Sequence, residues 1–232
     1  MVNILITRQE NQAKELAELL GQEGYNSFVE PLFEVKTLDL SDYSLKKSPS
    51  FVIITSANAI FALNQFKIDK NTKIYAVGSK TAQKIAEIGY KNIVSTQKYS
   101  ALALKNLICD NQQEKTGIYL CGSIITIDFS KELQEFGFEI EKILAYKIIE
   151  SKNLSKQLLK FSEKNNFDIV LLFSQNSAII FFNLAKEYNL LDYFNNSKIL
   201  CLSKKIFLQV KALGFQNVAE FKDFKILKEF YD

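Results

Sequence analysis

Small and polar residues follow several apolar segments of this chain at the points where each segment ends. Ser56 and Ala57 come directly after one such segment, and Ser174 and Gln175 follow another. A Ser at the start of a helix caps its first N–H groups, so capping alone accounts for either Ser. The same N–H groups favour anions, and open α/β sheets bind ligands at the carboxyl ends of their strands. These turns therefore predict helix caps or sites for carboxylates.

Two further turns add positive charge. In Gly78-Ser79-Lys80-Thr81 the Gly permits close backbone approach, two hydroxyls are available and Lys80 is cationic. A solvated turn explains this segment equally well, and the spacing of a Walker A loop is absent. Arg8 directly follows the first apolar segment, where a guanidinium suits an anion.

The chain contains no His, which removes the usual general base at neutral pH. Catalysis by Ser-His-Asp or Cys-His groups is excluded, as is any zinc site that contains His. Cys109, Cys121 and Cys201 are odd in number and far apart, so we expect buried thiols rather than a disulfide framework or a metal cluster. No pair of carboxylates stands out. Any reaction here must need little acid–base work.

Composition limits the class of protein. The 232 residues suggest one large or two ordinary domains, and 47% of them are hydrophobic. The net charge of +3 is too balanced to indicate nucleic-acid binding. No signal peptide is evident, and no apolar run approaches the roughly 20 residues that cross a membrane. We expect a soluble cytoplasmic protein.

Short apolar runs alternate with amphipathic segments along the chain. Residues 2–7 read as a buried strand, and Ala13, Leu16 and Leu20 then recur at helical spacing. Further strands are predicted at 51–55, 73–77, 118–121, 169–173 and 198–202, with helices at about 57–66 and 81–88. This alternation predicts parallel sheets with helices on both faces.

The pattern also repeats internally. Residues 4–7 resemble 118–121, residues 53–60 resemble 171–178, and residues 77–80 resemble 202–205, with an offset of roughly 113–125 residues that is far too long for a solenoid. The repeat predicts two related α/β halves. The connecting segments 32–38 and 143–149 are apolar and strand-like, so they could pair into a short β ladder.

The ordered motifs, which cover essentially the whole chain, resemble those of uroporphyrinogen-III synthases. They are residues 4–8 with Gly24-Tyr25 and Pro31, residues 54–59 (like the family's "TSxxAV"), residues 75–82 (like "xxVGxxTA"), residues 119–122 with Gly137 and Ala145-Tyr146, and Phe173-Ser174 with Ala178 and Gly214.

The resemblance implies two flavodoxin-like parallel-sheet domains that arose by internal duplication and are joined by a two-stranded β ladder. Residues 1–33 and 149–232 would form the first, discontinuous domain, and residues 36–146 the second. Residues 32–38 and 143–149 would connect them.

The implied activity is the cyclisation of hydroxymethylbilane to uroporphyrinogen III. The terminal pyrrole is inverted through a spiro intermediate, and water is lost. The resemblance also implies a monomer without a cofactor or metal, which acts on a small molecule rather than on nucleic acid or a membrane. A transient hand-over from the preceding pathway enzyme would deliver the substrate.

The resemblance makes Tyr146 the residue that helps the hydroxyl depart; the alternative is a Tyr that only packs in the ladder. The residues expected to bind substrate are Thr7, Arg8, Ser56, Ala57, Gly78, Ser79, Lys80, Thr81, Gly122, Ser174, Gln175, Ser203, Lys204 and Lys205.

Two departures from the family pattern affect this site. Where the family reads "IGxxTA" in its C-terminal repeat, this chain has Leu202-Ser203-Lys204-Lys205-Ile206-Phe207. The two lysines replace the lost hydroxyl as carboxylate ligands, or the site is degraded. The segment after Gly122 also lacks a basic residue that the family often carries.

Two other functions are compatible with parts of this pattern. A non-catalytic, two-lobed cytosolic protein that binds an anionic small molecule would have the same architecture, and catalytic turnover separates it from a synthase. A receiver-like signalling domain needs an acidic cluster after the first strand, where this chain has Thr7-Arg8-Gln9.

Overall fold

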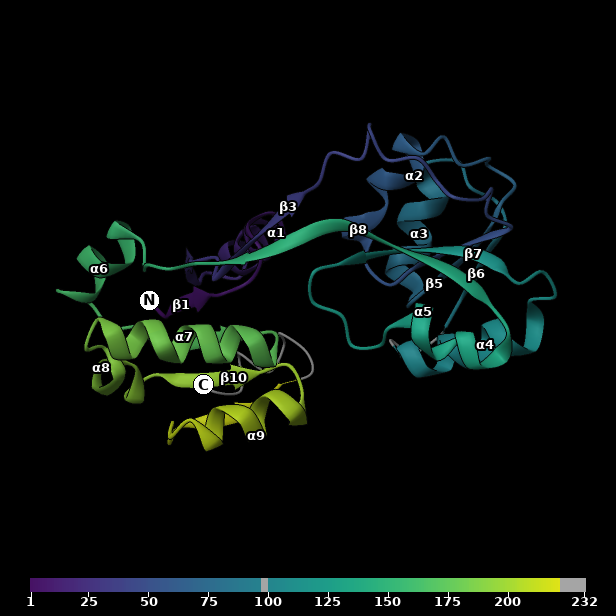
Figure 1. Ribbon diagram of the computed structural model, residues 1–232. Helices are drawn as coiled ribbons and strands as arrows, with labels where there is room; N and C mark the ends of the chain where they lie inside the picture. The colour runs from purple at the N-terminus through teal and green to yellow at the C-terminus, as the bar shows by residue number, and fades with distance from the viewer. Residues whose placement is uncertain (97–99, 222–232) are drawn as a thin grey trace. The chain divides into compact units, whose positions relative to one another are not determined.

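The computed structural model describes residues 1–96 and 100–221. It divides into two compact units, Met1–Glu34 with Ile149–Asp232, and Val35–Ile148 (Figure 1). The expected domain ranges include residues 97–99 and 222–232, which lie outside the described residues. The predicted alternation of parallel strands and helices is confirmed. No helix of the described residues is long and apolar enough to cross a membrane.

The first unit holds a five-stranded sheet in the order β11-β10-β9-β1-β2. Every adjacent pair is parallel, and β1 lies between β2 and β9. Its elements are β1 (Asn3–Ile6), α1 (Glu10–Gln22), β2 (Asn26–Val29), α6 (Lys156–Ser162), β9 (Ile169–Leu172), α7 (Gln175–Glu187), α8 (Leu191–Asn195), β10 (Lys198–Cys201), α9 (Lys204–Ala212) and β11 (Val218–Glu220).

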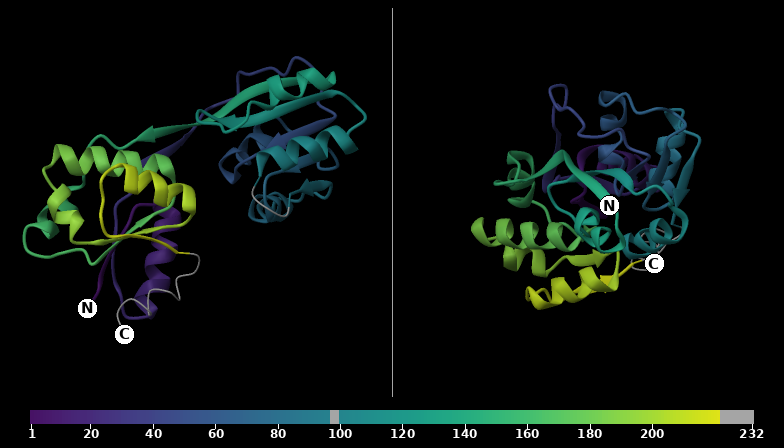
Figure 2. Two further views of the ribbon diagram at one scale, coloured as in Figure 1. Left: turned by 90° about the horizontal axis from the view of Figure 1, so that it is seen from below. Right: turned by 45° about the vertical axis from the view of Figure 1, so that its right-hand side comes forward.

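Apolar side chains cover both faces of this sheet. On one face Leu5 and Val170 pack with residues of α6, α7, α8 and α9, and on the other Ile4 and Ile169 pack with α1. The views of Figure 2 agree with this division, with α1 in purple and α7 in green. Strands buried on both faces read as continuous apolar runs, which is why the sequence revealed them.

The second unit holds a six-stranded sheet in the order β3-β8-β7-β4-β5-β6. Strands β4 to β8 pair in parallel, and the division between the units falls inside β3 and β8. Its elements are β3 (Phe33–Thr37), β4 (Phe51–Ile54), η1 (Ala57–Ala59), α2 (Phe61–Gln65), β5 (Lys73–Ala76), α3 (Ser79–Glu87), β6 (Ile93–Ser95), α4 (Ala101–Asn111), β7 (Thr116–Gly122), α5 (Phe129–Glu132), η2 (Gln134–Phe136) and β8 (Glu139–Glu150).

Two layers of helices cover this second sheet. Even-numbered residues of β7, such as Ile118 and Leu120, pack with α2 and α3. Odd-numbered residues, such as Tyr119 and Cys121, pack with α4 and α5. This strict alternation along β7 fixes which face a neighbouring side chain must reach.

Two predicted elements differ from the structure. The continuous helix expected at 57–66 is a 3₁₀ turn, η1, followed by the short α2. The Ser56 hydroxyl accepts a hydrogen bond from the Asn58 N–H at 3.3 Å, which tightens the first turn. The strand-like connection expected at 143–149 is the end of a longer strand, β8, which begins at Glu139.

Candidate functional site

Thr7 and Arg8 lie at the carboxyl end of β1. Thr7 is buried, and its hydroxyl donates to the Leu171 carbonyl at 2.6 Å, which ties β1 to β9. The Arg8 Nε donates to Gln12 Oε1 at 2.5 Å, and its guanidinium carbon lies 5.0 Å from the centroid of the Phe173 ring. Burial lowers the pKa of Arg8, but a guanidinium keeps its charge in proteins. Arg8 is thus a positioned cation at this sheet edge.

Ser174 follows β9, the neighbouring strand. Its Oγ accepts from the Ser177 N–H at 3.0 Å and lies 2.7 Å from Ser177 Oγ, so it caps α7. Gln175 is exposed in the first turn. The hydroxyl of Ser174 is therefore engaged in capping, as one of the two interpretations of this turn predicts.

Ser203 follows β10 and precedes α9, but its side chain makes no capping hydrogen bond. Lys204 and Lys205 are exposed in the first turn, and Lys204 Nζ lies 4.4 Å from the centroid of the Phe207 ring. Cations at a helix N-terminus oppose the helix dipole by about 0.3–1 kcal/mol each. A bound anion would relieve this repulsion, so the turn is electrostatically suited to a carboxylate.

In the second unit, the turn after β5 begins with Gly78, whose φ of 76° lies in the left-handed region that favours glycine. The Gly78 N–H donates to Thr96 Oγ1 at 3.2 Å, and no side chain caps α3. Ser79 and Lys80 are exposed, whereas Thr81 is buried. Lys80 and the first turn of α3 thus remain candidate anion ligands, while Thr81 belongs to the core.

Ser56 and Ala57 lie at the carboxyl end of β4, and both are half-buried. The Ser56 hydroxyl caps η1, as described above. Apart from Tyr146, which lies within β8 beside the end of β7, the residues predicted from sequence lie at or just after the carboxyl ends of adjacent strands within each unit. Thr7, Arg8, Ser174 and Ser203 belong to the first unit, and Ser56, Gly78, Gly122 and Tyr146 to the second.

Tyr146 and Gly122 are the predicted residues that the structure brings into direct contact. Tyr146 is 6% exposed on β8, beside the end of β7. A methyl group added at Gly122 would lie 2.5 Å from Tyr146 Cε2 and 2.7 Å from its Oη, closer than real Cβ atoms approach. Gly122 is therefore needed here so that the tyrosine ring can lie across the backbone.

A β-bulge aims Tyr146 at Gly122. Strands β7 and β8 pair regularly as far as Cys121 opposite Leu144, but Gly122 lies opposite Tyr146, so Ala145 is an extra residue. Ala145 and Tyr146 consequently pack in the same apolar cluster, although alternation would place them on opposite faces. The bulge moves the Tyr146 side chain to the face that Gly122 leaves open.

Sequence reasoning assigned no role to Tyr119 or Ser123. The Tyr119 hydroxyl lies 3.4 Å from Thr55 Oγ1. Burial raises the pKa of Tyr119, and the proximity of Cys121 and Tyr146 raises it further. The Ser123 N–H donates to the Tyr146 carbonyl at 3.0 Å. Their partners, Thr55 and Tyr146, lie far from them along the chain, so these contacts leave no local pattern in the sequence.

The cysteines offer no reactive thiol near this edge. Burial raises the pKa of Cys121 to about 11 and that of Cys201 to about 12, so both stay protonated at neutral pH. Cys109 is half-buried, and burial raises its pKa as well. Across residues 1–96 and 100–221, no group of three or more Cys, Asp or Glu residues is arranged to hold a metal ion.

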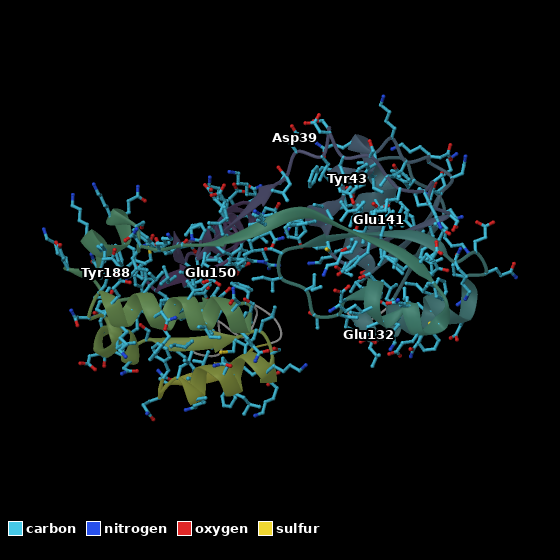
Figure 3. All side chains as sticks on the ribbon, viewed as in Figure 1. Asp39, Tyr43, Glu132, Glu141, Glu150 and Tyr188 are labelled. Atoms are coloured by element: carbon cyan, nitrogen blue, oxygen red, sulfur yellow. The ribbon has the colours of Figure 1, made fainter. Side chains whose placement is uncertain are left out.

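A pocket of about 560 Å³ lies at the opposite edge of the second sheet. Its lining includes Lys46 and Thr116 with Gln134, Glu139 and Glu141. Two acidic side chains of this pocket have partners: Glu139 forms an ion pair with Lys47, and Glu141 accepts a hydrogen bond from the Tyr43 hydroxyl at 2.8 Å. Figure 3 labels Tyr43 and Glu141 in the second unit. None of the residues predicted from sequence to bind or act lines this pocket.

The chain was compared with known proteins. A family model described as uroporphyrinogen-III synthase HemD matches residues 14–226. A protein of Methanocaldococcus jannaschii, whose assignment as a uroporphyrinogen-III synthase is itself provisional, is 26% identical over 170 residues, which are 70% of this chain and 68% of that protein.

Solved structures share the fold. The uroporphyrinogen-III synthetase of Helicobacter pylori matches with a TM-score of 0.68 and 16% identity, over 99% of this chain and 98% of that one. A mutant uroporphyrinogen III synthase of Thermus thermophilus matches with a TM-score of 0.63 and 14% identity, over 99% and 97% of the two chains. At these identities the likeness shows the fold and no more.

Proposed function

The chain belongs to the uroporphyrinogen-III synthase family, and we propose from this premise that it closes hydroxymethylbilane into uroporphyrinogen III with inversion of the terminal pyrrole. The family match across residues 14–226 is the observation that carries the proposal. Members of this family are lyases of porphyrin and heme biosynthesis.

Hydroxymethylbilane carries eight carboxylates, and the chain offers groups that suit them. Arg8 is a positioned cation at the end of β1, and Lys204 and Lys205 are the first two residues of α9, which has no side-chain cap. In the second unit Lys80 is the second residue of α3, which also has no side-chain cap. Backbone N–H groups and cations at helix starts are ordinary ligands for carboxylates. We assign these groups, with Ser79 and Gln175 beside them, to substrate binding.

We assign Ser56 and Ser174 a structural part in substrate binding. Their hydroxyls cap η1 and α7, so they order the turns while the neighbouring backbone N–H groups would meet the substrate. Thr7 and Thr81 are buried and would act by fixing the backbone of the adjacent residues. Single changes at these positions should therefore have modest effects on turnover.

Tyr146 is the residue proposed to act in the chemical step. Its hydroxyl would donate a hydrogen bond to the departing hydroxyl of the substrate, whose C–O bond breaks as water forms. The terminal pyrrole then attacks through its substituted carbon, and the spiro intermediate rearranges and closes. The substrate hydroxyl and one ring hydrogen leave together as water, so no oxidant or cofactor is required.

The remaining contribution would be conformational. Hydroxymethylbilane closes without an enzyme to the type I isomer, so the protein must hold the chain in the geometry that favours inversion. Fixing reacting atoms in a near-attack geometry can supply a large part of a rate enhancement. This role suits a chain that has no His and whose described cysteines are held protonated by burial.

A coupled assay tests this function. The preceding enzyme of the pathway generates hydroxymethylbilane in situ, and the products are oxidised and separated into type I and type III isomers. The control reaction omits the protein and gives type I. An excess of type III that scales with protein concentration is expected. Type I alone, from a sample whose folding is shown by circular dichroism, would overturn the synthase and favour a protein that only binds anions.

A further inference from the structure

Ser123 makes two hydrogen bonds to the bulged part of β8. Its N–H donates to the Tyr146 carbonyl at 3.0 Å, and its Oγ accepts from the Ile148 N–H at 3.0 Å. Strand β7 ends at Gly122, so its backbone carbonyls no longer serve β8 beyond this point. The Ser123 hydroxyl takes the place of the next acceptor in the ladder. The two bonds hold the backbone of β8 on either side of Lys147, directly after Tyr146.

The bulge is also held on its other side. The Leu38 N–H donates to the Ala145 carbonyl at 2.9 Å. This bond joins two backbone groups, so almost any residue at position 38 would make it. The bond to Ile148, in contrast, depends on a side-chain oxygen at position 123. Ser123 is therefore a position at which a change of side chain alters the bonding of β8 next to the bulge.

A one-residue change of register would move Tyr146 away from its place beside Gly122. Side chains on neighbouring strand positions point to opposite faces, so without the bulge the tyrosine would point to the face of Leu144. Gly122 lacks a Cβ, which leaves room for the ring but does not itself fix the register. The two hydrogen bonds of Ser123, together with the bond from Leu38, are the bonds that hold β8 in this register beside the bulge.

We propose that Ser123 is a positioning residue for the ring closure, which holds the bulge of β8 so that the Tyr146 hydroxyl stays beside Gly122. The inference rests on the proposed function, in which Tyr146 assists departure of the substrate hydroxyl. Ser123 touches none of the reacting atoms in this account and acts through Tyr146.

Loss of the hydroxyl should change activity more than stability. Ser123 is exposed, so water can hydrogen-bond the Ile148 N–H once the side chain is gone. A hydrogen bond of this kind corresponds to about a three- to tenfold change in an equilibrium or rate. Because the substrate carboxylates bind elsewhere, the loss should appear in kcat and leave KM unchanged.

The experiment compares Ser123→Ala with Ser123→Thr, which keeps the hydroxyl. The matched control is Ser50→Ala, which removes a serine hydroxyl bonded at 2.5 Å to the Thr116 carbonyl, at the opposite end of β7. Steady-state kinetics give kcat and KM for type III formation. The 13C signal of the Tyr146 Cζ, assigned with Tyr146→Phe, reports the ring environment independently of activity.

We expect kcat of Ser123→Ala to fall about three- to tenfold with a shifted Tyr146 signal, while Ser123→Thr and Ser50→Ala resemble the parent protein. If the parent forms type III and Ser123→Ala matches Ser50→Ala in kcat and in the Tyr146 signal, the positioning role is wrong although the function stands. If the parent forms only type I, the proposed function fails, and with it the role of Ser123.

Discussion

Replacing Gly122 with Ala tests directly whether the place of Tyr146 matters for turnover. The new Cβ would lie 2.5 Å from Tyr146 Cε2, whereas ordinary contacts begin at 3.4 Å. The Tyr146 ring must therefore move by about 1 Å, because the new Cβ is attached to the backbone of β7 and cannot move away itself. A displacement of this size at a catalytic group can cost as much as a hundredfold in rate.

Gly117→Ala provides the matched control on the same strand. There the added Cβ would lie 2.7 Å from Cζ of Phe51, on the face that packs with α4 and α5. Overpacking of this kind costs about 1–3 kcal/mol in either variant. For a protein of this size that corresponds to a fall in Tm of roughly 2–4 °C per kcal/mol. The two variants should therefore be destabilised alike.

The assay measures kcat for type III formation beside Tm from thermal unfolding. We expect Gly122→Ala to lose at least tenfold in kcat, and Gly117→Ala to keep the parent value at a similar Tm. Equal kcat values in the two variants would refute the reasoning, because the ring of Tyr146 would then have moved without consequence.

Three further predictions follow from the described side chains. Tyr146→Phe removes one proton donor, so it should lower kcat about 10²-fold or more with little change in Tm. Steady-state kinetics and thermal unfolding measure these two quantities. An unchanged kcat would show that Tyr146 only packs. Ala at both Lys204 and Lys205 should raise KM about two- to tenfold at constant kcat, and an unchanged KM at low salt would remove these lysines from the site. Burial raises the pKa of Glu30 despite hydrogen bonds from Ser155 at 2.7 and 2.5 Å. The folded state thus binds this proton more tightly, so its stabilising effect is complete below the unfolded pKa of about 4.3 and is lost as pH rises through the higher folded value. Glu30→Gln should therefore gain stability relative to the parent as pH rises across this window, measured by urea unfolding, and a parallel pH dependence of the two proteins would contradict the shift.

The sequence predicted most of the elements because their signals are local. Strands buried on both faces appear as apolar runs, as in 51–55 for β4, and the apolar spacing of Ala13, Leu16 and Leu20 marks α1. The split of the helix expected at 57–66 was missed, because it depends on where the Ser56 hydroxyl bonds. Caps and turns of this kind are decided by single hydrogen bonds rather than by periodicity.

The candidate site divides in the same way. The residues at strand ends were found from sequence, since the carboxyl end of a parallel strand is defined by the strand itself. Tyr146 was selected by resemblance to a family, and nothing in its local pattern distinguishes it from other tyrosines. Tyr119 and Ser123 were missed because their hydrogen bonds with Thr55 and Ile148 join segments far apart in the chain.

The sequence by itself thus determined the class of fold, the family, and the absence of histidine chemistry, because composition, periodicity and ordered motifs are properties of the chain alone. The tertiary structure decided that β1 pairs with β9 and that a bulge turns Tyr146 towards Gly122. It also decided which serine hydroxyls cap a helix, as that of Ser174 does. Strand partners and register are set by contacts between distant segments, and a shift of one residue moves a side chain to the other face of the sheet.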